Sequence, residues 1–294
     1  MHPLLIGFLP SYGLMAATAL LVAWIWFIRG AERDGLDPHE AGRIAFWTVV
    51  GGLLGAKLGL VIVDFGWYAG DLGRLLSIDF LRAAGVIWAG VLSGLVTLAV
   101  LAWRAELPLG RLLDAVAVPL PVSQAIGRIG CLLAGCCYGS SCALPWAVTY
   151  HSAEAHDQQG VPLGVGLHPT PLYEAAWNVL VVLPAVMLVR ARRQRPGEAA
   201  LAYLVLYGSG RFVVELFRGD AVRGLWFGGL LSTSQLISLV VAPAAAVAWL
   251  SLRLRQRASQ PSTSRPDGKS DAASDAAADS TPPASEPWEH PKNA

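Results

Sequence analysis

The sequence predicts an all-α, polytopic membrane protein with about seven transmembrane helices. Of its 294 residues, 54% are hydrophobic and only 15% are charged, and the mean hydropathy is +0.49. A membrane-spanning helix needs about 20 consecutive, mostly apolar residues. Seven segments approach this length, namely residues 11–29, 44–64, 86–103, 111–126, 171–190, 199–217 and 230–252.

Two of these segments carry residues that predict a local feature. In the second, Gly51, Gly55 and Gly59 recur every four residues, so they share one helix face and allow a neighbouring helix to approach closely. In the fourth, Pro119 and Pro121 interrupt the apolar run, and proline at membrane depth is tolerated where neighbours satisfy the freed backbone groups. The fourth segment is therefore expected to be a broken or kinked helix.

Arginines follow the first, third, fifth and seventh segments and predict the orientation in the membrane. They lie at positions 29 and 33, 104 and 111, 190–195, and 253–257. Basic loops remain on the cytoplasmic side, so the amino terminus and the loops near 65–85, 127–170 and 218–229 are expected on the other side. The carboxyl terminus is then cytoplasmic. The first segment lacks a basic leader and is expected to be retained, not cleaved.

Residues 1–257 are expected to form one seven-span membrane domain, followed by a disordered cytoplasmic tail over 258–294. The tail is rich in Ser, Pro, Ala and Asp and has almost no large apolar residues, so it cannot bury enough surface to offset the entropy of ordering. The net charge of +1 comes without a basic patch or stripe, which argues against nucleic-acid binding.

Two polar runs lie in or beside the apolar segments and predict a functional site. They cover residues 127–138 and 207–218, and each contains an arginine, Arg128 and Arg211. An arginine at the bilayer centre costs at least about 2.5 kcal/mol, so its presence there is a functional hypothesis by default. Lys57 lies between Gly55 and Gly59, where it either reaches the membrane surface or points into a polar cavity.

Six motifs in order resemble the prolipoprotein diacylglyceryl transferase family, and together they cover most of residues 11 to 250. They are Ser11–Met15, Gly55–Gly59, Gly127–Gly130 with Pro145–Trp146, His168–Glu174, Tyr207–Arg218 and Leu231–Ser238. The resemblance implies transfer of diacylglycerol from phosphatidylglycerol to the lipobox cysteine of a prolipoprotein. It implies phosphatidylglycerol, a prolipoprotein and membrane lipid as partners, no cofactor, and a place in the bacterial cytoplasmic (inner) membrane.

The resemblance also implies roles for particular residues. Arg128 and Arg211 would hold the lipid phosphate, because a guanidinium fork matches two phosphate oxygens. The expected catalytic residues are Arg211, Glu215, Tyr207 and His168, and the expected substrate-binding residues are Arg128, Tyr12, Lys57, Gly127 and Gly130. Two alternatives remain open. Glu215 either pairs with Arg211 one turn away or acts in catalysis, and His168 is either a surface histidine beside a turn or a catalytic one.

Three positions depart from the family pattern. Trp88 stands where the family has a histidine thought to be catalytic, and Cys131 and Cys136 stand where it has an asparagine and a glutamate. An indole cannot accept a proton. Three classes of function therefore remain open: a divergent transferase with another base, a related membrane enzyme of thiol or lipid chemistry, and a non-catalytic lipid-binding protein.

All four cysteines fall within twelve residues on the expected outer side, at Cys131, Cys136, Cys137 and Cys142. An oxidising compartment favours disulfides, so at least one bridge is expected, with Cys131 or Cys142 joined to one of the adjacent pair. Four cysteines allow three pairings, which the sequence does not distinguish. Redox or thiol-transfer chemistry is one alternative, and metal binding is a second, less favoured one. No metal site is assigned, because the spacing lacks the C-x-x-C pairs of zinc sites.

Overall fold

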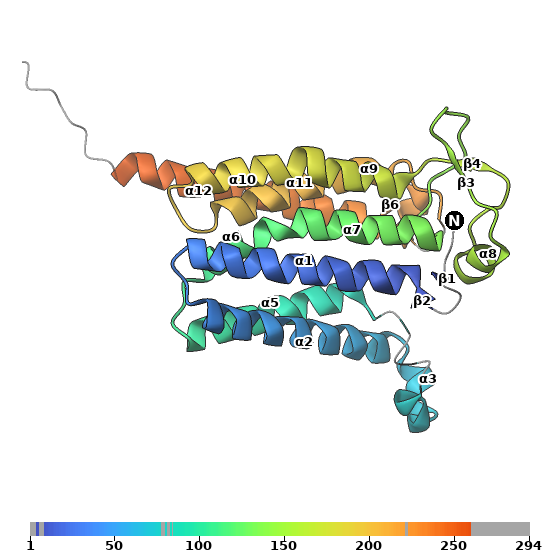
Figure 1. Ribbon diagram of the computed structural model, residues 1–294, viewed down its shortest axis with the longest axis horizontal. Coiled ribbons are helices and arrows are strands. Elements are labelled where there is room, and N and C mark those ends of the chain that lie inside the picture. The colour runs from blue at the N-terminus through green and yellow to red at the C-terminus, as the bar shows by residue number, and fades with distance from the viewer. Residues whose placement is uncertain are drawn as a thin grey trace, which may run out of the picture.

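The computed structural model describes residues 4–5, 9–77, 80, 83, 85–220 and 223–259, and its long helices lie side by side in one bundle (Figure 1). The long and medium helices are α1 (Ser11–Arg33), α2 (Pro38–Val63), α5 (Ile87–Arg104), α6 (Leu109–Ala117), α7 (Pro119–Ala134), α9 (Thr170–Trp177), α10 (Leu183–Arg192), α11 (Glu198–Glu215) and α12 (Thr233–Ser259).

Short elements fill the connections. The short helices are α3 (Phe65–Ala69) and α8 (Ala153–Gln159), the 3₁₀ turns η1 (Leu72–Leu76) and η3 (Phe227–Gly229), and the π turn η2 (Asn178–Val182). Three antiparallel pairs of two-residue strands complete the chain: β1 (Leu4–Leu5) with β2 (Leu9–Pro10), β3 (Val148–Thr149) with β4 (Gly166–Leu167), and β5 (Leu225–Trp226) with β6 (Leu231–Ser232).

The prediction of a helical, multi-pass membrane protein is confirmed. Within the described residues, six helical segments are long and apolar enough to cross a membrane: 11–33, 38–63, 87–104, 109–134, 170–192 and 233–255. The remaining expected span corresponds to α11, which has 18 residues but carries Glu198, Arg211 and Glu215. Length and composition therefore support six spans, and a crossing by α11 stays a prediction.

The fourth span is interrupted as its prolines predict. α6 ends at Ala117 and α7 begins at Pro119, where proline is compatible with the first turn because the missing N–H would have no helical partner there. The expectation that the outer loop begins at residue 127 is wrong. α7 continues to Ala134 and ends only at Gly135, which adopts the left-handed conformation of a helix cap with φ of 81°. Arg128 and Cys131 are thus helical residues.

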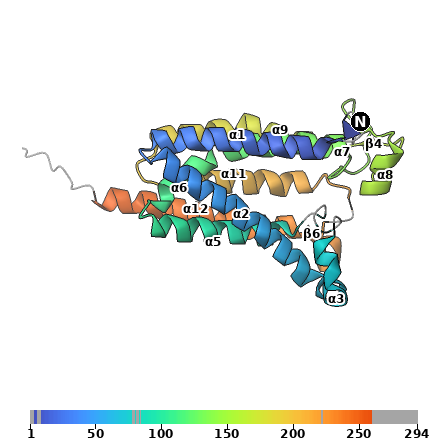
Figure 2. The same ribbon diagram turned by 60° about the horizontal axis from the view of Figure 1, so that its bottom comes forward.

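The expected glycine face of α2 packs against α5. A Cβ atom built on Gly51 would lie 2.3 Å from Thr97 Oγ1, one on Gly55 would lie 1.8 Å from Ser93 Oγ, and one on Gly59 would lie 2.5 Å from Ala89 Cβ. Such distances are too short for any side chain, so the three glycines set how closely the two helices approach. Figure 2 shows α2 and α5 crossing beside the rest of the bundle.

The loops that carry the functional motifs gather at one end of the bundle. In Figure 1, α3, α8, β3, β4 and β6 lie near this end, close to the start of α1, whereas α12 ends at the opposite end. The start of α1 and the end of α12 thus lie at opposite ends of the bundle. The opposite end is held by ion pairs of Asp34 with Arg190 and Arg193, at 3.0 and 2.5 Å. Which end faces the cytoplasm stays a prediction from the basic loops.

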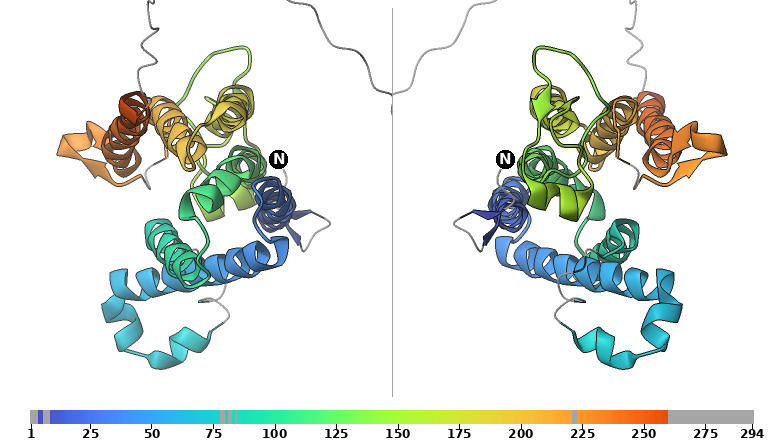
Figure 3. Two further views of the ribbon diagram at one scale, coloured as in Figure 1. Left: turned by 90° about the vertical axis from the view of Figure 1, so that its left-hand side faces the viewer. Right: turned by 90° about the vertical axis from the view of Figure 1, so that its right-hand side faces the viewer.

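The expected tail is mostly beyond the described part of the chain. Helix α12 continues to Ser259, two residues past the expected boundary at 257, and residues 260–294 lie outside the described residues. Viewed along the bundle, α12 and α11 lie on the far side from α2 and α5, with α1 and α7 between them (Figure 3).

We expect Gly55→Ala to destabilise the protein by about 1–3 kcal/mol, because the added methyl group overpacks the contact of α2 with Ser93 and the carbonyl of Ala89. The measurement is the thermal unfolding midpoint of the purified protein in detergent. Gly66→Ala is the matched control, since a Cβ at Gly66 meets nothing within 4 Å. Equal midpoints for the two variants would contradict the close α2–α5 contact.

Candidate active site around Glu174

A single carboxylate joins the two arginines singled out in the sequence. Arg128 on α7 contacts Glu174 Oε1 at 2.8 Å, and Arg211 on α11 contacts Glu174 Oε2 at 3.1 Å. The side chain of Glu174, on α9, is only 3% exposed, and those of Arg128 and Arg211 are 19% and 11% exposed. Two stretches of chain about eighty residues apart therefore meet at one buried charge.

Tyr207 and Ser234 complete the contacts of this carboxylate and of Arg211. Tyr207 lies one turn before Arg211 on the same face of α11, and its hydroxyl donates to Glu174 Oε1 at 3.2 Å. The Tyr207 ring stacks on Tyr203 with centroids 5.5 Å apart, which fixes its direction. Arg211 Nη2 donates to Ser234 Oγ, in the first turn of α12, at 3.1 Å.

Glu215 forms the intrahelical pair expected from its spacing. Its Oε2 lies 2.7 Å from Arg211 Nη2, one turn earlier, and 3.5 Å from Arg218 Nη1. Arg218 also pairs with Asp220, so its side chain is 10% exposed and turns into the site instead of out to a membrane surface. Glu215 Oε1 is buried and makes no hydrogen bond with any described residue, which leaves one acceptor in the site for a substrate group.

These residues form one connected network with an excess of positive charge. We call it the Glu174 cluster, and it has four arginines against three carboxylates, which leaves one net positive charge. Its members are Arg128, Glu174, Arg211, Glu215, Arg218, Asp220 and Arg223, the last of which donates to the backbone carbonyls of Asp220 and Glu215. The network favours an anionic ligand over a cationic one.

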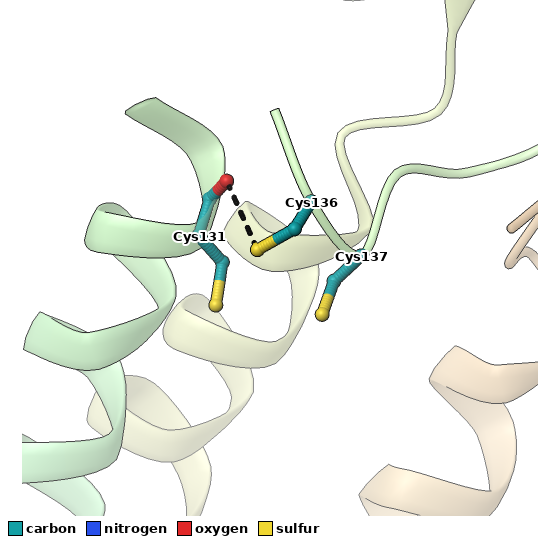
Figure 4. A group of neighbouring side chains, drawn as sticks. All are labelled: Cys131, Cys136 and Cys137. Atoms are coloured by element: carbon teal, nitrogen blue, oxygen red, sulfur yellow. Dashed lines mark hydrogen bonds between the residues drawn. The ribbon is translucent and has the colours of Figure 1, made fainter. Parts of the chain in front are cut away.

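Three of the four cysteines lie beside Arg128. The Sγ atoms of Cys131, Cys136 and Cys137 all lie within 4.8 Å of one another, and Arg128 Nη1 is 3.5 Å from Cys137 Sγ. Figure 4 shows Cys131 on the helix and the adjacent pair on the loop that follows it. Cys142 is not part of this group. All four thiols are free in the structure, and the expected disulfide stays a prediction.

The thiols of the loop differ in acidity. Hydrogen bonds from Cys131 and Cys136 lower the pKa of the Cys137 thiol below its ordinary value, and the guanidinium groups of Arg128 and Arg218 act in the same direction. Hydrogen bonds with Cys131 and Cys137 raise the pKa of the Cys136 thiol. The arrangement therefore stabilises one thiolate, on Cys137, with thiols as donors to it.

The side-chain contacts of His168 are with aromatic residues beside the Glu174 cluster. Its Nδ1 is 3.1 Å from the hydroxyl of Tyr173, and its ring is 5.4 Å from that of Phe217. The backbone carbonyl of His168 accepts from Gly139, so the histidine is tied to the cysteine loop. Its ring is half-buried within an aromatic group, and the choice between a structural and a catalytic histidine stays a prediction.

Of the other expected site residues, those on α1 and α7 lie near the cysteines. Tyr12 is half-exposed in the first turn of α1, and a Cβ on Gly130 would lie 3.4 Å from its ring. Gly130 thereby allows α1 to approach α7. A Cβ on Gly127 would meet nothing within 4 Å, so an open space borders α7 one residue before Arg128.

Lys57 and Trp88 lie on the α2–α5 pair. Lys57 Nζ donates to the backbone carbonyls of Phe80 and Ala83, and it lies 4.9 Å from the centre of the Phe80 ring. The lysine thus holds the connection before α5. Trp88 lies in the first turn of α5 with 42% of its surface exposed.

Glu174 is the central residue that the sequence reasoning did not assign. It lies inside the motif from His168 to Glu174, yet no role was given to it. Two signals were present: a carboxylate within an apolar segment is itself a functional hypothesis, and two buried arginines need a counter-charge. Asp220 and Ser234 were also not predicted. Each takes part in the site only through its contact with an arginine, which the sequence does not show.

The comparisons with known proteins agree with this geometry. The profile of the family described as prolipoprotein diacylglyceryl transferase matches residues 5–251. The chain belongs to this family. The resemblance predicted from the motifs is therefore confirmed, and the arginines, Glu174 and the cysteine loop all fall inside the matched range.

Several curated relatives carry the name phosphatidylglycerol–prolipoprotein diacylglyceryl transferase. The one from Clostridium tetani is 30% identical over 232 residues, which are 78% of this chain and 87% of that protein. The one from Thermosynechococcus vestitus is 32% identical over 231 residues, covering 78% of this chain and 83% of the relative. The one from Finegoldia magna is 28% identical over 231 residues, covering 78% and 86%. The similarity to the diacylglyceryl transferases thus extends over nearly the whole helical bundle.

We expect Glu174→Gln to lower the free energy of unfolding by about 3–5 kcal/mol, because the amide leaves two buried guanidinium groups without their shared counter-charge. Thermal unfolding in detergent measures the change. Glu40→Gln is the matched control. It breaks the exposed pair with Arg43, which contributes only about 0–1 kcal/mol. A Glu174→Gln variant as stable as Glu40→Gln would contradict a structural role for this carboxylate.

We expect Cys137 to be alkylated in the folded, reduced protein at a pH below the ordinary thiol range, near 8.5, because the thiolate is the reactive form. The measurement is the rate of iodoacetamide labelling at each cysteine as a function of pH, read by peptide mass spectrometry. In the unfolded chain the same rate is expected to rise only near the ordinary thiol pKa. Identical pH profiles of Cys137 in the folded and unfolded protein would refute the stabilised thiolate.

Proposed function

We propose that this chain transfers diacylglycerol from phosphatidylglycerol to the lipobox cysteine of a prolipoprotein in the bacterial cytoplasmic membrane. Family membership and the relatives' names support the reaction. The single structural observation that carries the proposal is the convergence of Arg128 and Arg211 on one buried carboxylate. In the reaction a carbon–sulfur bond forms, the bond from that carbon to the phosphate oxygen breaks, and glycerol phosphate leaves with the electron pair.

Arg128 and Arg211 would bind the phosphate of the lipid. Each guanidinium has five N–H donors in a planar fork, and Glu174 takes only one nitrogen of each arginine. Glu174 acts as a positioning residue, since it holds two positive groups together that would otherwise repel each other. As negative charge builds up on the departing phosphate, fixed donors around it lower the barrier without having to reorganise.

The incoming thiol must lose its proton, because the thiolate is the nucleophile. We assign this proton to Glu215, whose Oε1 is buried and free of hydrogen bonds among the described residues. His168 is the alternative base, supported by its half-buried position beside the loop. Tyr207 donates to Glu174 and so keeps the carboxylate directed at both arginines. Tyr12, Gly127 and Gly130 would line the approach along α1 and α7.

We interpret the chain as a divergent member of its family. Trp88 occupies the place of the family's histidine, and Cys131 and Cys136 occupy the places of its asparagine and glutamate. Trp88 lies in the first turn of α5, and its indole ring cannot act as a base. A base elsewhere in the site is therefore part of the proposal.

We expect Arg211→Ala and Arg128→Ala each to lower diacylglyceryl transfer by roughly 100-fold, because each removes a charged donor from the phosphate. The assay uses the purified protein in phosphatidylglycerol vesicles with a lipobox peptide, and lipid co-purified with each variant is measured alongside. Arg43→Ala is the control, since Arg43 forms only an exposed pair with Glu40. Full transfer and unchanged retention of anionic lipid by Arg211→Ala would overturn the phosphate assignment.

Two further variants distinguish the bases in the same assay. Glu215→Gln is expected to lose transfer and His168→Asn to retain most of it, and the reverse result would assign the proton to His168. Rescue of a strain depleted of its own diacylglyceryl transferase tests the function as a whole. Lack of rescue by a stably inserted protein would favour a related thiol or lipid chemistry, or a non-catalytic lipid-binding role.

A further inference from the structure

The three clustered cysteines have the geometry of a metal site. Their Sγ atoms lie within 4.8 Å of one another, and an ion bound to three sulfurs at about 2.3 Å in a plane holds those sulfurs about 4 Å apart. Small side-chain rotations therefore suffice for all three to reach one ion. The sequence did not predict this grouping, because Cys131 and Cys136 are five residues apart, Cys136 and Cys137 are adjacent, and neither spacing is a C-x-x-C pattern. The end of α7 and the turn after it bring the three residues together.

The backbone around the three cysteines is held in place without a metal. The N–H groups of Gly135 and Cys136 both donate to the carbonyl of Cys131, at 3.0 and 3.1 Å. Thr170 Oγ1 donates to the backbone carbonyl of Cys137 at 2.5 Å. Cys137 adopts a left-handed backbone conformation with φ of 57°. A binding site that is already ordered loses little entropy when the ion arrives.

The charge around the cysteines favours thiolate ligands. Metals bind the thiolate and not the thiol, so a site must release protons as the ion binds. Arg128 Nη1 lies 3.5 Å from Cys137 Sγ, and the Glu174 cluster as a whole carries one excess positive charge. The excess positive charge would also partly balance the negative charge of a thiolate–metal complex.

The donor set selects the kind of ion. Among the described residues, no histidine or carboxylate joins the three sulfurs in the group. Thiolates select soft ions, and zinc almost always takes four ligands in structural sites, whereas three sulfurs suit monovalent copper. Cys131 is buried and the adjacent pair is half-buried, so the site is protected on one side and reachable on the other.

We propose that Cys131, Cys136 and Cys137 bind one Cu(I) ion through three thiolates. The ion is taken up as Cu(I) and stays Cu(I), and the protons still held by the three thiols pass to solvent. The site adjoins Arg128, and the proposal goes beyond the transfer reaction, since it requires no turnover.

The test is a titration of the full-length, reduced protein in detergent with Cu(I) under anaerobic conditions, in competition with a chromophoric Cu(I) chelator. We expect one Cu(I) per chain, with X-ray absorption showing three sulfur neighbours. Cys131→Ser, Cys136→Ser and Cys137→Ser should each weaken binding by about tenfold or more. Cys142→Ser is the matched control and should bind as the wild type does, because Cys142 lies outside the group.

Three results would overturn the proposal: no Cu(I) retained against the chelator, binding that depends on Cys142, or binding unchanged when all three clustered cysteines are serine. Tighter retention of Zn(II) than of Cu(I) would overturn the choice of ion. Gel filtration and the unfolding midpoint of each variant without metal show whether it is folded. Because the readout is bound metal, a protein inactive in lipid transfer can still support the proposal, and an active one can refute it.

Discussion

The arrangement of the site depends on the pairing of Glu174 with two arginines from different helices. Arg128 on α7 and Arg211 on α11 would repel each other at this separation, and burial raises the cost of leaving either unpaired. The carboxylate on α9 resolves both problems at once. It also fixes how α7, α9 and α11 are placed relative to one another, so packing and chemistry depend on the same contact.

The remaining charges follow from this pairing. Arg211 has a second partner in Glu215, and Glu215 in turn contacts Arg218, which pairs with Asp220. Each carboxylate of this series forms an ion pair with an arginine. The polar network therefore extends from the interior of the bundle to the loops at one end. Such a network is stable only while its members are paired, because a buried charge left without its partner is costly.

Much of the fold could be predicted from the sequence, because its signals are local. Apolar length located the helices, the glycines at every fourth position of α2 located its contact with α5, and two prolines located the break before α7. The end of α7 was misplaced, since a run of Gly, Arg and Cys resembles a loop in composition yet continues as helix to Gly135. Composition alone does not show whether neighbouring helices satisfy a polar run.

The site was predictable only in part, because its geometry is not local. Arg128, Arg211, Glu215 and Tyr207 were recognisable from their motifs, and the structure brings them together. Glu174 was overlooked, although it contacts both arginines, because its importance arises from three helices meeting. The spacing of the cysteines along the chain did not predict that three of them form a group. The group arises because the end of α7 and the following turn bring these three residues together.

None of the named members of the Glu174 cluster lies on α2 or α5, which pack on each other through small residues at the edge of the bundle. The ion pairs of the cluster therefore do not depend on a charged side chain from either of these two helices. A lipid with two acyl chains is far bulkier than its headgroup, and it must enter from the bilayer and leave again enlarged by a peptide. A rigid electrostatic centre and a wide entrance from the bilayer are compatible in one bundle when different helices provide them.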